Sequence, residues 1–164
     1  MSSFHYILGI QSFANEHASA ALVKFSRDGK VLEYAAIAEE RLLRKKHPYT
    51  FPLHAIGYCM DAFGLKSLDE VDLLVTDYSR LPRWFRSCPT YNTLEYDYLK
   101  MKFAMDPQKI RTIGHHLAHA ASAYYVSGFD DAAILVVDGM GSDLETTSYF
   151  KGEGNKITLL ERYG

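Results

Sequence analysis

The sequence predicts an α/β fold in which a mixed sheet carries flanking helices. Short apolar runs separated by turn signals indicate strands, and a segment that begins at Pro52 has helical periodicity. The strand pattern of residues 6–38 recurs at roughly 133–163. Composition agrees, because 48% hydrophobic and 23% charged residues are typical of a globular protein, and 164 residues suffice for a substantial core.

The first forty residues predict three strands, Tyr6–Ile10, Ala18–Phe25 and Val31–Ala38. Arg27–Lys30 between the last two contains Asp-Gly, which supplies the positive φ values of a tight hairpin. The charged segment Glu39–His47 follows and stops at a proline.

The middle of the chain predicts a helix, a capped turn and a strand. These cover Pro52–Gly64, Ser67–Glu70 and Val71–Thr76. Residues 77–108 are rich in Tyr, Arg and Pro and predict an irregular excursion, with a helix near Leu94–Met105.

The last third predicts one helix among short strands. The strands are Lys109–Ile113, Ala133–Val137, Thr146–Lys151 and Ile157–Arg162, the helix is Leu117–Val126, and the connections are Phe129–Ala132 and Glu153–Asn155.

The repeated strand pattern is the signature of the actin-like, ribonuclease H-like architecture, in which two similar α/β halves face each other across a nucleotide cleft. Residues 1–132 would form the first half, and residues 133–164 the opening strands of a truncated second half. We therefore expect an N-terminal piece of a longer protein. The alternative is a complete α/β domain whose two halves are alike by coincidence.

Charge and cysteine content exclude some classes of partner. The net charge of -2 gives no reason to expect nucleic acid or an acidic membrane surface. Neither a signal peptide nor an apolar run of about eighteen residues is present. Cys59 and Cys88 have no metal-binding spacing, and Cys59 falls in the helical pattern as a small buried residue. A reduced, cytoplasmic setting is expected.

A candidate metal site stands out near residue 115. His115 and His119 are four positions apart in an alanine-rich run, so a helix places both imidazoles on one face. Asp138 ends an apolar run that predicts a buried strand. Two imidazoles and a carboxylate suit Fe, Mn or Zn. His116 points about 100° away, which leaves open a supporting role, a ligand contact or a plain surface position.

The residues after this aspartate predict either a phosphate-binding loop or an ordinary hairpin turn. Gly139 and Gly141 would let backbone N–H groups approach phosphate oxygens. The hydroxyls of residues 146–148 could add donors, although hydroxyls are common in strands. The basic run Arg41–His47 is equally open to two interpretations, a solvated face or a loop that clamps an anion.

Several stretches together resemble the O-carbamoyltransferases of antibiotic and nodulation-factor biosynthesis, the NodU/CmcH type. The N-terminal domain of that family is similar to the actin-like domain of the threonylcarbamoyl-adenosine tRNA enzymes. The resemblance runs in the same order over most of the chain and is weak across residues 77–108. The stretches are Tyr6–Leu22, Ala38–Pro52, Ile56–Leu65, His115–Tyr125 and Val137–Tyr149.

The resemblance implies an activity and a metal. The family makes carbamoyl-adenylate from carbamoyl phosphate and ATP in a separate C-terminal domain, and its actin-like domain transfers the carbamoyl group to a hydroxyl of a small molecule. The metal is usually taken as iron, with Mn or Zn as alternatives. His115, His119 and Asp138 match three of its ligands, and a further aspartate would lie in the later half.

The resemblance also implies contacts to the adenylate. Gly139, Gly141 and Ser142 match the phosphate-side loop, although the family usually has an acidic residue directly after Gly141. Lys46 and His47 match the Lys-His of the family's basic segment and would contact the adenylate or the acceptor.

The catalytic base implied by the resemblance is less clearly placed. The family commonly has Asn-x-x-His-Asp in its first turn, whereas this chain has Gln11–His17. Without a gap Glu16 takes the place of the histidine, and a shift of one residue restores His17. Either residue could accept a proton from a hydroxyl.

The leading hypothesis is therefore the N-terminal part of a carbamoyltransferase that acts on a small-molecule hydroxyl, and we expect the isolated 164-residue chain to be inactive. An actin-like ATPase or small-molecule kinase with Mg²⁺, and a non-catalytic fragment or binding module, are the alternatives. The sequence names neither the acceptor nor the metal, and it leaves a homodimer open.

Overall fold

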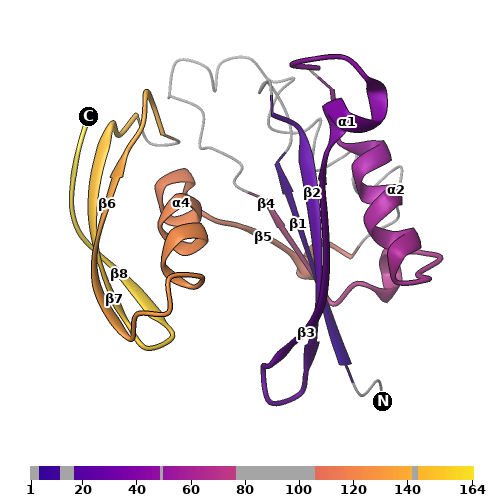
Figure 1. Cartoon of the computed structure of the whole chain (residues 1–164), viewed down its shortest axis with the longest axis horizontal. Coiled ribbons are helices and arrows are strands. Elements are labelled where there is room, and N and C mark those ends of the chain that lie inside the picture. Colours follow the sequence, from indigo (N-terminus) through magenta and orange to yellow (C-terminus); the bar gives the residue numbers. More distant parts are fainter. Residues whose placement is uncertain (1–3, 12–16, 49, 77–105, 142–143) are drawn as a thin grey trace. The chain divides into compact units, whose positions relative to one another are not determined.

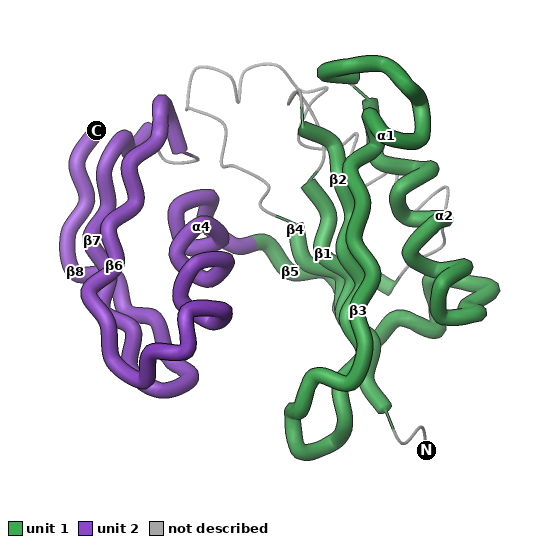
Figure 2. Tube along the Cα trace, in the orientation of Figure 1, with its two compact units in different colours: residues 1–76, 89–112 green, residues 77–88, 113–164 purple. Residues whose placement is uncertain are grey.

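The computed structural model describes residues 4–11, 17–48, 50–76, 106–141 and 144–164 (Figure 1). The chain divides into two compact units, residues 1–76 with 89–112 and residues 77–88 with 113–164 (Figure 2). The helix expected near residues 94–105 lies outside the described residues. The division expected after residue 132 concerns the halves of the repeat and stays a prediction.

The first unit is built on a mixed five-stranded sheet with the order β3-β2-β1-β4-β5. β1, β2 and β3 form an antiparallel meander, and β4 and β5 are added in parallel beside β1. The predicted strands of this unit are confirmed to within a few residues. They are β1 Phe4–Gln11, β2 Ser19–Ser26, β3 Val31–Ala38, β4 Leu73–Thr76 and β5 Ile110–Thr112.

Helix α2 (Leu53–Ala62) packs against β2 and β3 and encloses the main hydrophobic core (Figure 1). Cys59 is fully buried there, as predicted, with its sulfur 3.4 Å from the carbonyl oxygen of Ala35. Such apolar burial is the main favourable term in folding. The buried core residues are Leu8, Ile10, Ala20, Leu22, Ala55, Ile56, Cys59, Leu65, Leu68, Val71 and Leu74.

Local signals in the sequence end the helix and form the turns as predicted. Gly64 follows α2 with φ +68°, and the N–H of Leu65 donates to Met60 O at 3.0 Å, which closes the last turn. Ser67 and Glu70 form a capping box around the short 3₁₀ helix η1 (Leu68–Glu70). A second 3₁₀ turn, η3 (Pro107–Lys109), leads into β5.

The charged segment after β3 contains a short helix that the sequence pattern did not indicate, α1 (Glu39–Leu43). Its first residue explains it. The Glu39 carboxylate is fully buried and accepts hydrogen bonds from the backbone N–H groups of His54 (3.2 Å) and Ala55 (2.7 Å). Burial of a carboxylate is unfavourable unless hydrogen bonds compensate for the lost contact with water. Here the donors lie fifteen and sixteen positions along the chain, so a local sequence pattern does not show them.

The second unit contains the antiparallel meander β6 (Asp131–Val137), β7 (Thr147–Glu153) and β8 (Lys156–Tyr163), with helix α4 on one face (Figure 1). The strand pattern that recurs in the sequence corresponds to a topology that recurs in the structure, because β1–β2–β3 and β6–β7–β8 are both antiparallel meanders. Strand β6 begins two residues earlier than predicted, because Asp131 pairs with Glu153.

Helix α4 spans His115–Tyr124, two residues earlier at each end than predicted. Its first turn closes on Gly114, whose carbonyl accepts the N–H of Ala118 at 3.0 Å. Gly152 of β7 lies against the Tyr124 ring, where an added Cβ would come within 2.5 Å. Ala120, Val136 and Phe150 form the buried core of this unit.

No helix in the described part of the chain is both long and apolar enough to cross a membrane.

Candidate metal centre

The three predicted metal ligands meet in the second unit. His115 and His119 project from successive turns of α4, and Asp138 follows directly after β6, the strand against which α4 packs. The three side chains meet because the first two turns of α4 lie beside the end of β6. Among the described residues this is the one cluster of His, Cys, Asp or Glu with metal-ligand geometry.

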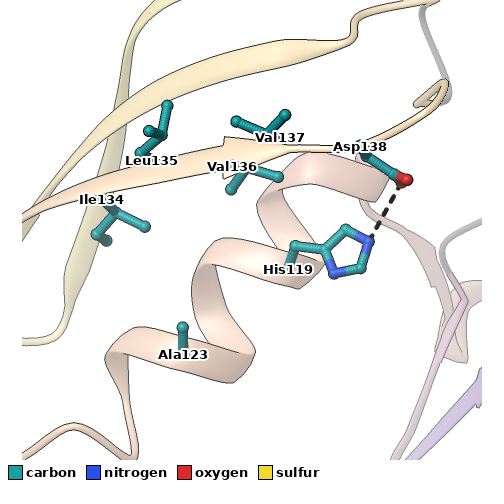
Figure 3. A pocket seen from close by; sticks show the side chains of 7 residues that line it. All are labelled: His119, Ala123, Ile134, Leu135, Val136, Val137 and Asp138. Carbon is teal, nitrogen blue, oxygen red and sulfur yellow. Dashed lines mark ion pairs between the residues drawn. The ribbon is translucent and has the colours of Figure 1, made fainter.

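The donor atoms lie close together. His115 Nε2 is 2.8 Å from Asp138 Oδ2, His119 Nε2 is 3.5 Å from the same oxygen, and the two Nε2 atoms are 3.0 Å apart. Figure 3 shows the His119 imidazole directed toward the Asp138 carboxylate. For comparison, ligand atoms about 2.0 Å from a tetrahedral Zn²⁺ are about 3.3 Å apart. The separations therefore fit one shared ion.

Asp138 is held as a carboxylate. Partial burial favours the neutral acid, but the Gly139 N–H donates to Oδ1 at 2.6 Å and His115 bonds to Oδ2, and together they lower the pKa of Asp138. The side chain is about one third exposed, whereas His119 is half exposed, so an ion or a ligand could reach the cluster from solvent. The donor set, two imidazole nitrogens and a carboxylate oxygen, suits Fe, Mn or Zn.

An open pocket of about 240 Å³ runs from these donors along α4 and β6 (Figure 3). His119 and Asp138 stand at one end, and the remaining wall is apolar. The apolar lining consists of Ala123, Ile134, Leu135, Val136 and Val137. Polar groups at one end of an apolar pocket are typical of small-ligand sites.

The two glycines after Asp138 differ in their surroundings. A Cβ at Gly139 would meet nothing within 4 Å, so the backbone there is open to approach. Gly141 is buried, and its N–H donates to Glu145 O at 2.7 Å. The N–H groups of both glycines are engaged within the chain. Phosphate contacts at the two residues stay predictions, and Ser142 lies outside the described residues.

His116, whose role the sequence left open, is not a surface residue. It is 2% exposed, and its Nδ1 lies 2.7 Å from the hydroxyl of Ser148, which is also buried. Burial lowers the pKa of His116, against the opposing charges of Glu145 and Asp138, so the neutral imidazole is favoured. Sequence analysis missed Glu145 as part of this neighbourhood, and it considered the Ser148 hydroxyl as a donor to phosphate, whereas that hydroxyl is buried against His116. The one available signal for Ser148 was its place in the alternation of β7.

Three of the remaining candidates lie in the first unit. The rings of His17 and His47 are in edge-to-face contact, with centroids 5.7 Å apart, although thirty positions separate them in the sequence. His47 and Arg44 both have positive φ, which turns the chain sharply after α1. Lys46 is exposed beside His47. Glu16, the alternative base, lies outside the described residues.

Glu39 connects the segments that carry these residues. Its N–H donates to the carbonyl of Ala18, next to His17, at 2.8 Å. Its side chain holds the start of α2, and it begins the helix that leads to His47. One buried residue thus fixes both ends of the contact between the two imidazoles.

Comparison with known proteins gives a consistent result. Residues 88–162 match the family model described as the carbamoyltransferase N-terminus. An uncharacterized protein of Synechocystis sp., sll1178, is 37% identical over 181 aligned residues that cover 93% of this chain. Nodulation protein NolNO of Sinorhizobium fredii is 32% identical over 161 residues that cover 90% of it. The chain spans about a quarter of the length of these relatives, 28% and 23%.

Solved structures show the fold. YeaZ from Pseudomonas aeruginosa matches 96% of this chain and 64% of its own with a TM-score of 0.53 at 16% identity. A structure described as an uncharacterized protein with similarity to peptidase YeaZ, from the same organism, also has a TM-score of 0.53, at 17% identity. The actin-like, ribonuclease H-like α/β fold is therefore confirmed, and so is the resemblance of this chain to the N-terminal segment of the carbamoyltransferase family.

Proposed function

We propose that this chain is the part of a carbamoyltransferase that binds a divalent metal and takes part in moving a carbamoyl group from carbamoyl-adenylate to a hydroxyl of a small natural product. The observation that carries the proposal is the convergence of His115, His119 and Asp138 within 4.8 Å of one another, inside the segment that matches the family model.

The three donors would hold the ion, with Fe as the first choice and Mn or Zn as alternatives. Bound there, the metal supplies positive charge that stabilises the phosphate of the departing adenylate. The chain itself keeps Asp138 ionised through the Gly139 N–H and orients both imidazoles on one face of α4. The open space at Gly139 would leave room for the phosphate beside the ion, and further ligands would come from outside these residues.

The transfer step requires a base. The acceptor oxygen bonds to the carbamoyl carbon, the bond between that carbon and the phosphate oxygen breaks, and adenosine monophosphate leaves. The hydroxyl proton passes to His17 or Glu16. The edge-to-face contact with His47 supports His17, because it places the imidazole against the segment that carries the exposed Lys46, whose charge suits an anionic substrate.

Kinase-type chemistry is less well supported. A nucleotide loop at residues 139–141 would need free backbone donors, and the N–H groups of Gly139 and Gly141 already bond within the chain. A Mg²⁺ site also favours oxygen ligands over two imidazoles.

Binding of adenosine monophosphate, the leaving group, tests the proposal. Binding to the chain should depend on added Zn²⁺ or Fe²⁺ and should be lost in Asp138→Asn, measured by calorimetry. Equal binding in the presence of a chelator would contradict it. With carbamoyl phosphate, ATP and a hydroxyl acceptor, the chain alone should give no product, because the adenylate-forming domain is expected elsewhere in a longer protein.

A further inference from the structure

We propose that His116 is a positioning residue for the metal centre, which ties helix α4 to strand β7 and supports the turn that carries Asp138. This inference rests on the proposed function, because it assigns a role beside the metal donors. His116 itself is not a donor: its ring centroid lies 6.2 Å from that of His115, and the side chain is buried on the sheet side of α4.

The first support is the contact to β7. His116 Nδ1 lies 2.7 Å from Ser148 Oγ, and both residues are almost completely buried, at 2% and 1% exposed. A hydrogen bond shielded from water in this way resists breaking, because either partner left alone would be buried without a bond. It fixes α4, and with it the two ligand imidazoles, against the sheet.

The second support is the contact to the turn between β6 and β7. A Cβ at Gly141 would lie 2.8 Å from His116 Cδ2 and 2.5 Å from Glu145 Oε1. The ring edge and the Glu145 carboxylate are therefore packed directly against the Gly141 backbone. Hydrogen bonds from Asp138 N to Thr146 O (2.9 Å) and from Gly141 N to Glu145 O (2.7 Å) make Asp138 the first residue of this same turn.

The third support is the chemistry of the side chain. His116 Nε2 is buried and has no hydrogen-bond partner among the described residues. A buried polar atom without a partner costs about 1–3 kcal/mol, which the bond from Nδ1 to Ser148 and the packing against Gly141 must offset. The His116 imidazole connects helix α4, which carries the metal ligands His115 and His119, to the turn that carries Asp138. Residues of this kind beside metal ligands typically change affinity about 10–100-fold when replaced.

Three variants distinguish the contribution of the His116 Nδ1 hydrogen bond from that of the volume of the side chain. The amide of Asn can take the place of Nδ1, whereas the amide of Gln reaches the place of Nε2. His116→Gln and Ser148→Ala should weaken Zn²⁺ binding, measured by competition with a chromophoric chelator, by about 10–100-fold, while His116→Asn should retain most of the affinity. His5→Asn, an exposed histidine of the first unit, is the control and should bind like the wild type.

A metal-free measurement keeps the inference separate from the proposed function. Hydrogen exchange of the Gly141 and Leu144 amides, which hold the turn, should accelerate in His116→Gln and Ser148→Ala and not in His116→Asn. If the wild-type chain binds no Zn²⁺, the proposed function is contradicted. The amide exchange rates of Gly141 and Leu144 then show by themselves whether His116 holds the turn. Unchanged exchange, or unchanged Zn²⁺ affinity in folded His116→Gln and Ser148→Ala, would overturn it. Ser148→Ala covers the case in which the His116 variants fail to fold.

Discussion

The two units contain the same three-stranded meander but use it differently. In the first, β1–β2–β3 is extended by two parallel strands and buries a cluster of eleven core residues with α2. In the second, β6–β7–β8 buries three core residues with α4, and the polar side chains of His116, Glu145 and Ser148 are buried as well. Because apolar burial drives folding, the described residues of the second unit have the smaller apolar contribution to stability, whereas the first unit adds one buried charged side chain, Glu39, to its larger core.

Each unit also brings two imidazoles into edge-to-face contact. The ring centroids are 5.7 Å apart for His17 and His47, and 4.6 Å apart for His115 and His119. The second pair lies beside a carboxylate, with His115 Nε2 2.8 Å from Asp138 Oδ2, and the three residues form the one group with metal-ligand geometry in the described part of the chain.

The largest expected effect is in the first core. Leu22→Ala should lower the free energy of unfolding by about 2–5 kcal/mol, because Leu22 is completely buried and the substitution removes three carbon atoms from the core. Val136→Ala, in the smaller core of the second unit, should cost less. Denaturant unfolding with hydrogen exchange read separately for each unit measures both. A greater cost at Val136 would contradict the contrast between the cores.

The next effect tests the buried charge of the first unit. Glu39→Ala should cost at least the roughly 1.5–3 kcal/mol of one hydrogen bond to a charged group, because two N–H groups at the start of α2 lose their acceptor. Glu40→Ala, one position along, is the control and should change stability by less than about 0.5 kcal/mol. The nuclear Overhauser contact between the His17 and His47 rings should weaken only in Glu39→Ala. An intact contact there would show that Glu39 does not fix the pair.

A matched pair of glycines tests the turn of the second unit. Gly141→Ala should destabilise by about 1–3 kcal/mol, because the new Cβ would overlap Glu145 and His116. Gly139→Ala has open space and should change stability by less than about 0.5 kcal/mol, while weakening metal-dependent binding of adenosine monophosphate. Thermal unfolding and calorimetry check both. Equal stability of the two variants would show that the turn is not packed as described.

The smallest effect is a pH dependence confined to the first unit. Hydrogen bonds from the backbone N–H groups of Lys66 and Ser67 lower the pKa of Glu70. Its contribution to stability is therefore complete above the unfolded pKa of about 4.3 and is lost as the pH falls through the lower folded value. Glu70→Gln should reduce the acid sensitivity of η1, measured by amide exchange between pH 3 and 6. An identical profile in the variant would contradict this.

Most of the fold was predictable because its signals are local. The Asp-Gly hairpin, the glycine after α2 and the Ser67/Glu70 capping box each act within a few residues. The short helix α1 was missed, since its stability depends on a buried Glu39 that binds residues fifteen and sixteen positions away.

The candidate site, like the fold, was predictable where its signals are local. The convergence of His115, His119 and Asp138 was predictable because helix spacing and a strand end bring them together, and their binding of a metal stays a prediction. The contact of His116 with Ser148 crosses thirty-two positions and depends on the packing of α4 against β7, which the sequence pattern does not encode. Where a helix rests on a sheet is decided by packing, so the residues around the donors could not be assigned beforehand.

The most direct test of the central claim is the metal content of the chain and of variants in each histidine pair. After loading with Zn²⁺ or Fe²⁺ and desalting, elemental analysis should find one ion per wild-type chain. That ion should be lost in His115→Ala, His119→Ala and Asp138→Ala, and retained in His17→Ala and His47→Ala. A wild-type chain without metal, or an ion retained in all three ligand variants, would contradict the assignment of the centre to the second unit.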